Sequence, residues 1–268
     1  MIHDVRPAAV AGSFYPEAPT PLAAQVRAYL AGAANTRGAP PKAVIVPHAG
    51  YVYSGPVAAA AYARLAPLQD VVTRVVLLGP THRVPVRGLA VPRARAFATP
   101  LGEVALDAAA ISIASALPQV IVSDDAHAAE HSLEVQLPFL QSVLGTFTLV
   151  PLAVGRATPD DVAAVLDVLW GGPETLIVVS SDLSHYHAYA DAQRIDRDTA
   201  DAILALSPNL DHEQACGAMP INGLLTCARR RELEPALLDL RNSGDTAGDR
   251  SRVVGYASFA FTDHGTRH

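Results

Sequence analysis

Arg74-Val-Val-Leu-Leu-Gly-Pro-Thr-His82 is an apolar run that stops abruptly at a glycine and a proline, directly before a histidine. Two other stretches share this pattern, Lys42-Ala-Val-Ile-Val-Pro-His48 and Leu176-Ile-Val-Val-Ser-Ser-Asp182. Apolar runs rich in β-branched residues and bounded by Pro, Gly or Ser predict buried strands of a parallel sheet. Ligands bind at the carboxyl ends of the strands in an open α/β sheet. We therefore expect the polar residues that follow these runs to meet in one crevice.

The composition is that of a single globular domain. Of the 268 residues, 50% are hydrophobic and 17% are charged, so the chain can bury a large core. Alanine-rich helical stretches alternate with Val/Ile/Leu runs from residue 20 to the end, and no long Pro/Ser/Gly linker divides them. This alternation is typical of a sheet with helices on both faces. We predict one domain over residues 1–268, an α/β/α sandwich with a mixed, largely parallel central sheet.

Periodicity and turn residues place the individual elements. We expect strands at 42–46, 74–79, 147–153, 175–180 and 252–261, and short strands near 88–92 and 119–123. Helices are expected at 20–32, about 107–117, 159–170, 189–206 and 217–230. A further helix should begin at Ser54 as N-cap with Pro56 in its first turn, and another should follow Glu130-His131. The polar stretch 242–250 is typical of an exposed loop.

Charge and composition exclude several classes of protein. A formal net charge of −6 argues against a nucleic-acid-binding protein, which would carry a basic face. No apolar run approaches the roughly 18–20 residues that a membrane span needs. The N-terminal residues lack the basic and apolar regions of a signal peptide. Two cysteines are too few for a disulfide framework, so we expect a protein of the reducing cytoplasm.

His48 and His82 are the first candidate metal ligands. His48 is followed by Ala49 and Gly50, and His82 is preceded by Gly79-Pro80-Thr81, so both histidines lie in tight turns. A lone histidine in such a turn is more typical of a structural or exposed residue. Two of them at the ends of successive strands indicate a shared polar site.

The octet Ser180–His187 follows an apolar strand and is too polar to continue as core. One interpretation is a capping turn, in which Ser181 or Asp182 begins the next helix. The alternative gives His185 a proton-transfer role, with Asp182 orienting or charging its ring. We take His185 and Asp182 as the candidate catalytic pair.

Four further residues are candidates for substrate or supporting contacts. Glu130 and His131 begin a leucine-periodic segment, and an acidic residue at the start of a helix interacts favourably with the helix dipole. Alternatively, both residues could line the same pocket as His48 and His82. Tyr51 and Tyr53 follow His48 closely and could line a groove for a ligand or an extended peptide. Packing roles explain both tyrosines equally well.

Cys216 is the third candidate metal ligand. A buried, inert thiol is the usual role of a lone cysteine, and Cys227 fits that role. Cys216 differs because it precedes Gly217 at the expected start of a helix, where the helix dipole would lower the thiol pKa. A thiolate at this position could be a nucleophile or a metal ligand.

Taken together, these motifs resemble the Memo family, whose bacterial members are labelled AmmeMemoRadiSam system protein B. The resemblance covers almost the whole chain in the family's order. It is carried by Val10-Ala-Gly-Ser-Phe-Tyr-Pro16, Pro47-His48-Ala-Gly-Tyr51-Val-Tyr53-Ser-Gly55, Gly79-Pro-Thr-His82, Glu130-His-Ser-Leu-Glu134, Ser180-Ser-Asp-Leu-Ser-His185 and Cys216-Gly-Ala-Met-Pro220.

The Memo family is similar in fold to class III extradiol dioxygenases, which use non-haem Fe(II). By this resemblance, His48 and His82 are metal ligands and His185 is the acid–base histidine. Cys216 stands where the dioxygenases have a carboxylate ligand. A thiolate softens the site, so Fe(II) is the expected metal and Cu or Zn are its competitors.

Three functions follow from the resemblance and the residues. The first is a non-haem iron-dependent oxidoreductase acting on a small molecule. The second is a non-catalytic module that binds a metal or a peptide, acting with the AMMECR1-like and radical-SAM proteins that the family label implies. The third is a zinc hydrolase, with His185 or Glu130 as the base beside a metal-bound water.

Overall fold

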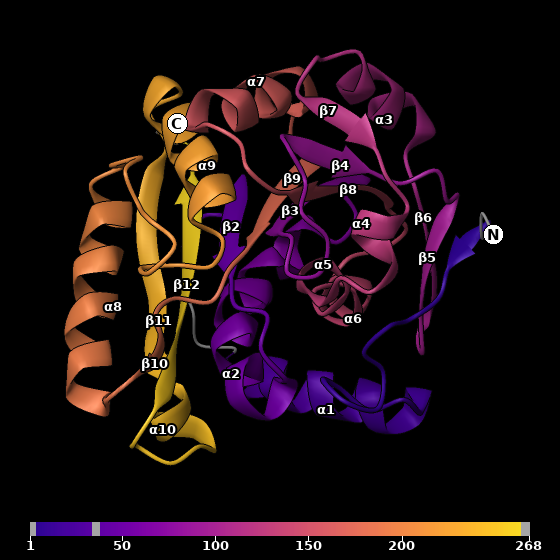
Figure 1. Ribbon diagram of the computed structural model, residues 1–268. Coiled ribbons are helices and arrows are strands. Elements are labelled where there is room, and N and C mark those ends of the chain that lie inside the picture. Colours follow the sequence, from indigo (N-terminus) through magenta and orange to yellow (C-terminus); the bar gives the residue numbers. More distant parts are fainter. Residues whose placement is uncertain (1–3, 34–37, 264–268) are drawn as a thin grey trace.

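The centre of the molecule is a block of four parallel strands (Figure 1). The computed structural model describes residues 4–33 and 38–263. In spatial order the four strands are β2 (Ala43–Val46), β9 (Thr175–Ser180), β3 (Arg74–Pro80) and β8 (Thr148–Val154). Because they are parallel, their carboxyl ends lie at one edge of the sheet. The three apolar runs that predict central strands are confirmed.

Strands on both sides extend this block into a mixed sheet, as predicted. On one side β12 (Val253–Thr262) pairs antiparallel with β2, and both β10 (His185–His187) and β11 (Glu234–Asn242) pair antiparallel with β12. On the other side β4 (Leu89–Val91) pairs antiparallel with β8 and parallel with β7 (Val120–Val122).

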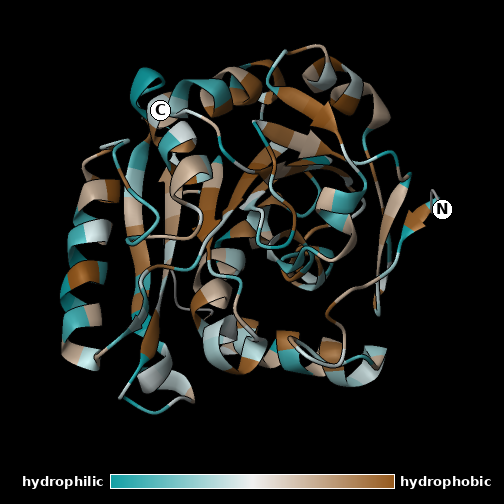
Figure 2. Cartoon of the chain, in the orientation of Figure 1, coloured by the Kyte–Doolittle hydropathy of each residue, from teal (hydrophilic) through white to brown (hydrophobic). Residues whose placement is uncertain are grey.

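Successive residues of a strand point to opposite faces of the sheet, and the central strands are apolar on both faces, so helices cover both. Ile45 packs into one core and its neighbours Val44 and Val46 into the other, and all are fully buried. The first face is covered by α3 (Ala108–Ser115), α7 (Pro159–Leu169), α8 (Tyr189–Leu204) and α9 (Ala218–Arg230). In Figure 2 the sheet is mostly brown and the outer side of α8 mostly teal, as this layering requires.

The second face carries α1 (Pro19–Gly32), α2 (Tyr51–Tyr62), the 3-10 helix η1 (Ala63–Leu68), α5 (His131–Glu134) and α6 (Leu137–Val143). Beside them lies a small sheet of β1 (Val5–Arg6), β5 (Ala96–Thr99) and β6 (Gly102–Ala105). Two single-turn helices complete the described elements, α4 (Asp125–Ala128) and α10 (Ser243–Thr246). Among the described residues, none of the helices is both long and apolar enough to span a bilayer.

Several predicted boundaries are wrong. Helix α2 begins at Tyr51 with Gly50 as N-cap, so Ser54 lies inside it, and its hydroxyl donates to the Ala49 carbonyl at 2.8 Å. Pro56 then lies within the helix, where it deprives the carbonyl of the exposed Val52 of its usual donor.

The leucine-periodic segment after residue 130 is two short helices, α5 and α6, rather than one helix. The stretch 242–250 contains α10, in which Asn242 and Asp245 form a capping box. Strand β11 and the β5–β6 hairpin were not expected. β11 is half-exposed, begins with Glu234-Pro235 and is interrupted by a bulge, so it shows neither a buried run nor clean alternation.

Candidate metal centre

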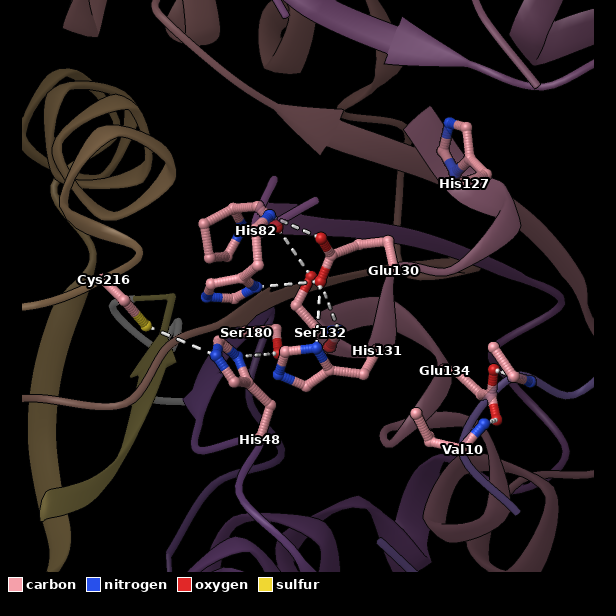
Figure 3. A network of polar contacts seen from close by, with 12 residues as sticks. Val10, His48, His82, His127, Glu130, His131, Ser132, Glu134, Ser180 and Cys216 are labelled. Carbon is pink, nitrogen blue, oxygen red and sulfur yellow. Dashed lines mark hydrogen bonds and ion pairs between the residues drawn. The ribbon is translucent and has the colours of Figure 1, made fainter. Parts of the chain in front are cut away.

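Three histidines from three elements meet at the carboxyl edge of the sheet (Figure 3). His48 follows β2, His82 follows β3, and His131 is the first residue of α5. One nitrogen from each ring lies within 4.8 Å of the others. The cluster confirms that residues after successive strands converge. It also includes His131, which the sequence predicted only as a candidate for substrate or supporting contacts.

The tautomer of His48 is fixed by a buried hydrogen-bond network. The hydroxyl of Ser180 donates its one hydrogen to the Ser132 carbonyl at 2.6 Å and accepts from Nε2 of Gln136 at 2.8 Å. Its remaining lone pair faces Nδ1 of His48 at 2.9 Å, so Nδ1 must carry the hydrogen. Burial lowers the pKa of His48 well below its usual value, and the ring is neutral. Nε2 therefore presents a lone pair.

His82 is oriented in the same way by Glu130. Nδ1 of His82 lies 2.9 Å from Oε1 of Glu130, and the His82 amide donates to Oε2 at 2.6 Å. Burial raises the pKa of Glu130, but the hydrogen bonds and charge of His82 outweigh it and bring the pKa to about 2. An ionised carboxylate only accepts, so Nδ1–H of His82 donates to it, and Nε2 is the nitrogen that can bind a metal once it carries no proton.

His131 is held between aromatic and acidic neighbours. Its ring lies 4.6 Å from that of His82 and 4.7 Å from that of Phe14. Nδ1 is 3.4 Å from Oε1 of Glu130, and within the described part of the chain this buried nitrogen has no hydrogen-bond partner. Burial lowers the pKa of His131 to about 4, so this ring is also neutral at neutral pH.

Cys216 lies on the far side of His48 from His131. Its sulfur is 3.3 Å from Nε2 of His48, the nitrogen that Ser180 leaves unprotonated. A thiolate and an imidazole bound to one tetrahedral ion at roughly 2.3 and 2.1 Å would be about 3.6 Å apart. The spacing is therefore close to that of two ligands of one metal, although the histidine cluster itself does not include Cys216.

The expected lowering of the Cys216 pKa is wrong. The residue is 8% exposed, and burial followed by the nearby Asp182 carboxyl raises its pKa to about 12. Helix α9 begins only at Ala218, with Gly217 as N-cap, and its dipole does not overcome this burial. The raised pKa makes Cys216 a neutral thiol at neutral pH, and this thiol can donate to Nε2 of His48.

Asp182 and His185 line the same cavity, but their expected pairing is absent from the contacts of the described residues. Oδ1 of Asp182 instead accepts from the His48 amide at 2.7 Å, which ties the histidine's turn to the end of β9. Burial raises the pKa of Asp182 to about 7, and burial lowers that of His185. A proton-transfer role for His185 stays a prediction.

A cavity of about 690 Å³ opens over the histidines. Tyr53 lines it, whereas Tyr51 is buried beneath, with its hydroxyl donating to the Val135 carbonyl at 2.7 Å. The cavity also includes residues that the sequence did not single out as site residues: Phe14, Arg83, Arg252 and Tyr256. Phe14 lies in the Val10–Pro16 motif and Arg83 directly follows His82, whereas no local motif marks Arg252 and Tyr256.

The donor set fits a metal ion. Two imidazoles are held at Nδ1 by oxygen partners, which leaves Nε2 as their metal-binding nitrogen, a third imidazole is neutral, and a thiol adjoins His48. Such partners on Nδ1 are the usual supports of metal-binding histidines. His48, His82 and either His131 or Cys216 could hold a divalent cation.

Comparisons with known proteins identify the family. The sequence model of a family described as Memo-like protein matches residues 6–260. This chain belongs to the Memo-like family. A MEMO1 family protein of Sulfolobus acidocaldarius is 34% identical over 97% of this chain and 100% of the relative. Another, of Aquifex aeolicus, is 34% identical over 96% and 99%, and one of Ignicoccus hospitalis is 36% identical over 96% and 98%.

A solved structure of the Escherichia coli K12 uncharacterized protein JW3007 aligns with 81% of this Memo-like chain and 98% of its own, at a TM-score of 0.48 and 15% identity. The family assignment does not depend on that alignment, because the sequence matches span nearly the whole chain.

Proposed function

We propose that this Memo-like protein is a metal-dependent oxidoreductase that binds Fe(II) through His48, His82 and Cys216. The observation that carries the ligand set is the pairing of a fixed His48 tautomer with a sulfur 3.3 Å from its free nitrogen. The redox class rests on the resemblance to class III extradiol dioxygenases. Fe(II) with open coordination positions would supply the reactivity toward oxygen and a small substrate.

The residues around the ligands have separable roles in this proposal. Ser180 and Glu130 hold the two imidazoles in the metal-binding tautomer, and Asp182 fixes the turn of His48. His185 lines the cavity and is neutral at neutral pH because burial lowers its pKa, so it can accept a proton from a bound substrate.

Metal analysis after anaerobic purification tests the ligand set. We expect about one iron per chain, lost in His48→Ala and in Cys216→Ser. Oxygen consumption that depends on bound iron and a small substrate would then support the oxidoreductase. Iron that is retained in both variants would refute this site, and tight binding of a protein partner without turnover would favour a binding module.

A zinc hydrolase is the second candidate, because the histidine cluster of His48, His82 and His131 matches a known catalytic zinc set of three histidines. It predicts that His131→Ala, rather than Cys216→Ser, removes the metal. Hydrolysis of simple esters by the zinc form, lost in His131→Ala, would support it.

A further inference from the structure

Tyr186 has a strained backbone at the mouth of the cavity. It lies in β10 between two residues that pair with β12, and the register shifts there, so Tyr186 is the bulged residue. Its φ is 61°, a conformation that is unfavourable for a bulky residue. The side chain lines the cavity and is 63% exposed. Bulges and strained residues of this kind often aim a side chain into a functional site.

Arg252 is stacked on this tyrosine. Its guanidinium carbon lies 5.3 Å from the centre of the Tyr186 ring, and the residue is exposed on the wall of the cavity. Stacking holds the plane of a guanidinium but leaves its N–H groups free for an anion. Tyr186 and Arg252 together are called the Tyr–Arg plate below.

The charge of the Tyr–Arg plate is not neutralised by the protein. No ion pair joins Arg252 or the other cavity arginine, Arg83, to an acidic residue in the described part of the chain. Asp249 also lines the rim, but its carboxylate accepts from the amide and hydroxyl of Ser251 at 2.7 and 2.5 Å. The second cavity carboxyl, Asp182, is bonded to the His48 amide.

The remaining wall of the cavity suits a flat ring. Phe14, Tyr53 and Tyr256 contribute aromatic side chains, and the histidine cluster contributes imidazoles. The volume of about 690 Å³ is within the range of small-molecule sites, roughly 300–1,000 Å³. A small aromatic ligand can stack here while a charged substituent reaches the arginines.

We propose that the Tyr–Arg plate is the substrate-recognition edge of the cavity and selects a small ring compound that carries a carboxylate or phosphate group. The inference rests on the proposed function only in taking this cavity as the substrate site. It requires neither iron nor turnover.

Binding of matched probes to the full-length protein tests the charge requirement. By calorimetry, we expect 4-hydroxybenzoate to bind at least about tenfold more tightly than its neutral isostere 4-hydroxybenzamide, the factor that one charge-assisted contact supplies. A second pair of probes without the hydroxyl group, phenyl phosphate and benzoate, distinguishes the two anionic groups. Tighter binding of phenyl phosphate assigns a phosphate, and tighter binding of benzoate assigns a carboxylate. Equal affinity for the acid and the amide would overturn the proposal.

Two variants assign the selectivity to the Tyr–Arg plate. Arg252→Gln should reduce the acid-to-amide ratio to within about twofold, whereas Arg194→Gln, at an exposed arginine on α8, should leave it unchanged. An unchanged ratio in Arg252→Gln refutes the assignment. Metal content should be the same in both variants, so failure of the iron proposal would be seen separately.

Tyr186→Gly separates recognition from folding. Glycine tolerates φ 61° without strain, so this variant should unfold at no lower denaturant concentration than the wild type. It should nevertheless bind 4-hydroxybenzoate several-fold more weakly, since the stacking surface is gone. A variant that binds the acid as tightly as the wild type would show that Tyr186 has no part in recognition.

Discussion

The sulfur of Cys216 and Nε2 of His48 lie 3.3 Å apart, close enough for a hydrogen bond between them. Ser180 keeps the hydrogen on Nδ1 of His48, so Nε2 can accept. Burial raises the pKa of Cys216 to about 12, so its sulfur can donate. A cation bound between the two atoms would have to displace the thiol hydrogen, because a metal binds the thiolate.

Proton release therefore distinguishes the two possible ligand sets. If Cys216 binds the metal, Zn²⁺ titrated into the apo-protein at pH 8 should release about one proton per ion. Calorimetry in buffers of different ionisation enthalpy measures this number. Cys216→Ser should lower the release to near zero, because burial already keeps His48 and His131 neutral at this pH. Full release from the serine variant would exclude Cys216 as a ligand.

Ser180 supports the metal site without contacting the ion. Ser180→Ala removes the acceptor that holds the hydrogen on Nδ1 of His48. Loss of such a partner typically weakens metal binding about 10–100-fold. Chelator competition with Zn²⁺ measures the affinity. Ser258→Ala is the matched control, because the Ser258 hydroxyl is also buried but has no hydrogen-bond partner among the described residues. Equal affinities of the two variants would contradict the role of Ser180.

The central strands and the turns after them could be predicted from sequence, because each is a continuous apolar run that ends in Pro, Gly or Ser. The position of His131 could not. It depends on how closely α5 approaches the end of β3, and Gly79 permits that approach: a Cβ on Gly79 would lie 2.8 Å from the hydroxyl of Ser132. The stacking of Arg252 on Tyr186 likewise depends on the pairing of β10 with β12, which no local pattern indicates.

Glu134 stabilises the fold through direct contacts of its carboxylate with the N-terminal segment, rather than through an interaction with a helix dipole. Its fully buried carboxylate is paired with Arg6 and accepts from the amides of Ala9 and Val10 at 2.7 and 3.0 Å and from the hydroxyl of Tyr15 at 2.5 Å. Glu134→Gln leaves Arg6 without a counter-charge, so we expect a loss of about 3–5 kcal/mol in the free energy of unfolding.

Urea denaturation measures this loss. Glu103→Gln is the control, because Glu103 forms a largely exposed pair with Arg95 at 3.1 Å and should change stability by less than about 1 kcal/mol. A comparable loss in the two variants would show that the Glu134 carboxylate does not anchor the N-terminal segment.

His127 should make the fold sensitive to acid. It is 1% exposed, its Nε2–H donates to the Ala90 carbonyl at 2.9 Å, and burial lowers its pKa to about 4. Between pH 6.5 and 4 the unfolded chain therefore binds a proton at this residue that the folded chain does not. Stability must fall as the pH falls through this window, by up to about 3 kcal/mol from this group.

The slope of unfolding free energy against pH tests this contribution. His48 and His131 act in the same direction, because burial lowers both of their pKa values, so wild type and variant must be compared. His127→Gln should show a shallower slope between pH 4 and 6.5, whatever its absolute stability. His212→Gln, at an exposed position, serves as the reference, and parallel curves for wild type and His127→Gln would disprove the assignment.

Gly217 allows Cys216 to approach His48. A Cβ at residue 217 would lie 2.6 Å from the Cβ of Ser181 and 2.9 Å from the carbonyl oxygen of Ser180, so Gly217→Ala must push this turn away from β9. We expect Zn²⁺ affinity to fall about 10–100-fold and the proton release to disappear, as if the thiol itself had been removed. Gly32→Ala, where an added Cβ meets nothing within 4 Å, should leave both quantities unchanged. If Gly217→Ala also retained full affinity and proton release, metal binding would not depend on the position of the Cys216 sulfur. His48, His82 and His131 alone would then account for the metal site.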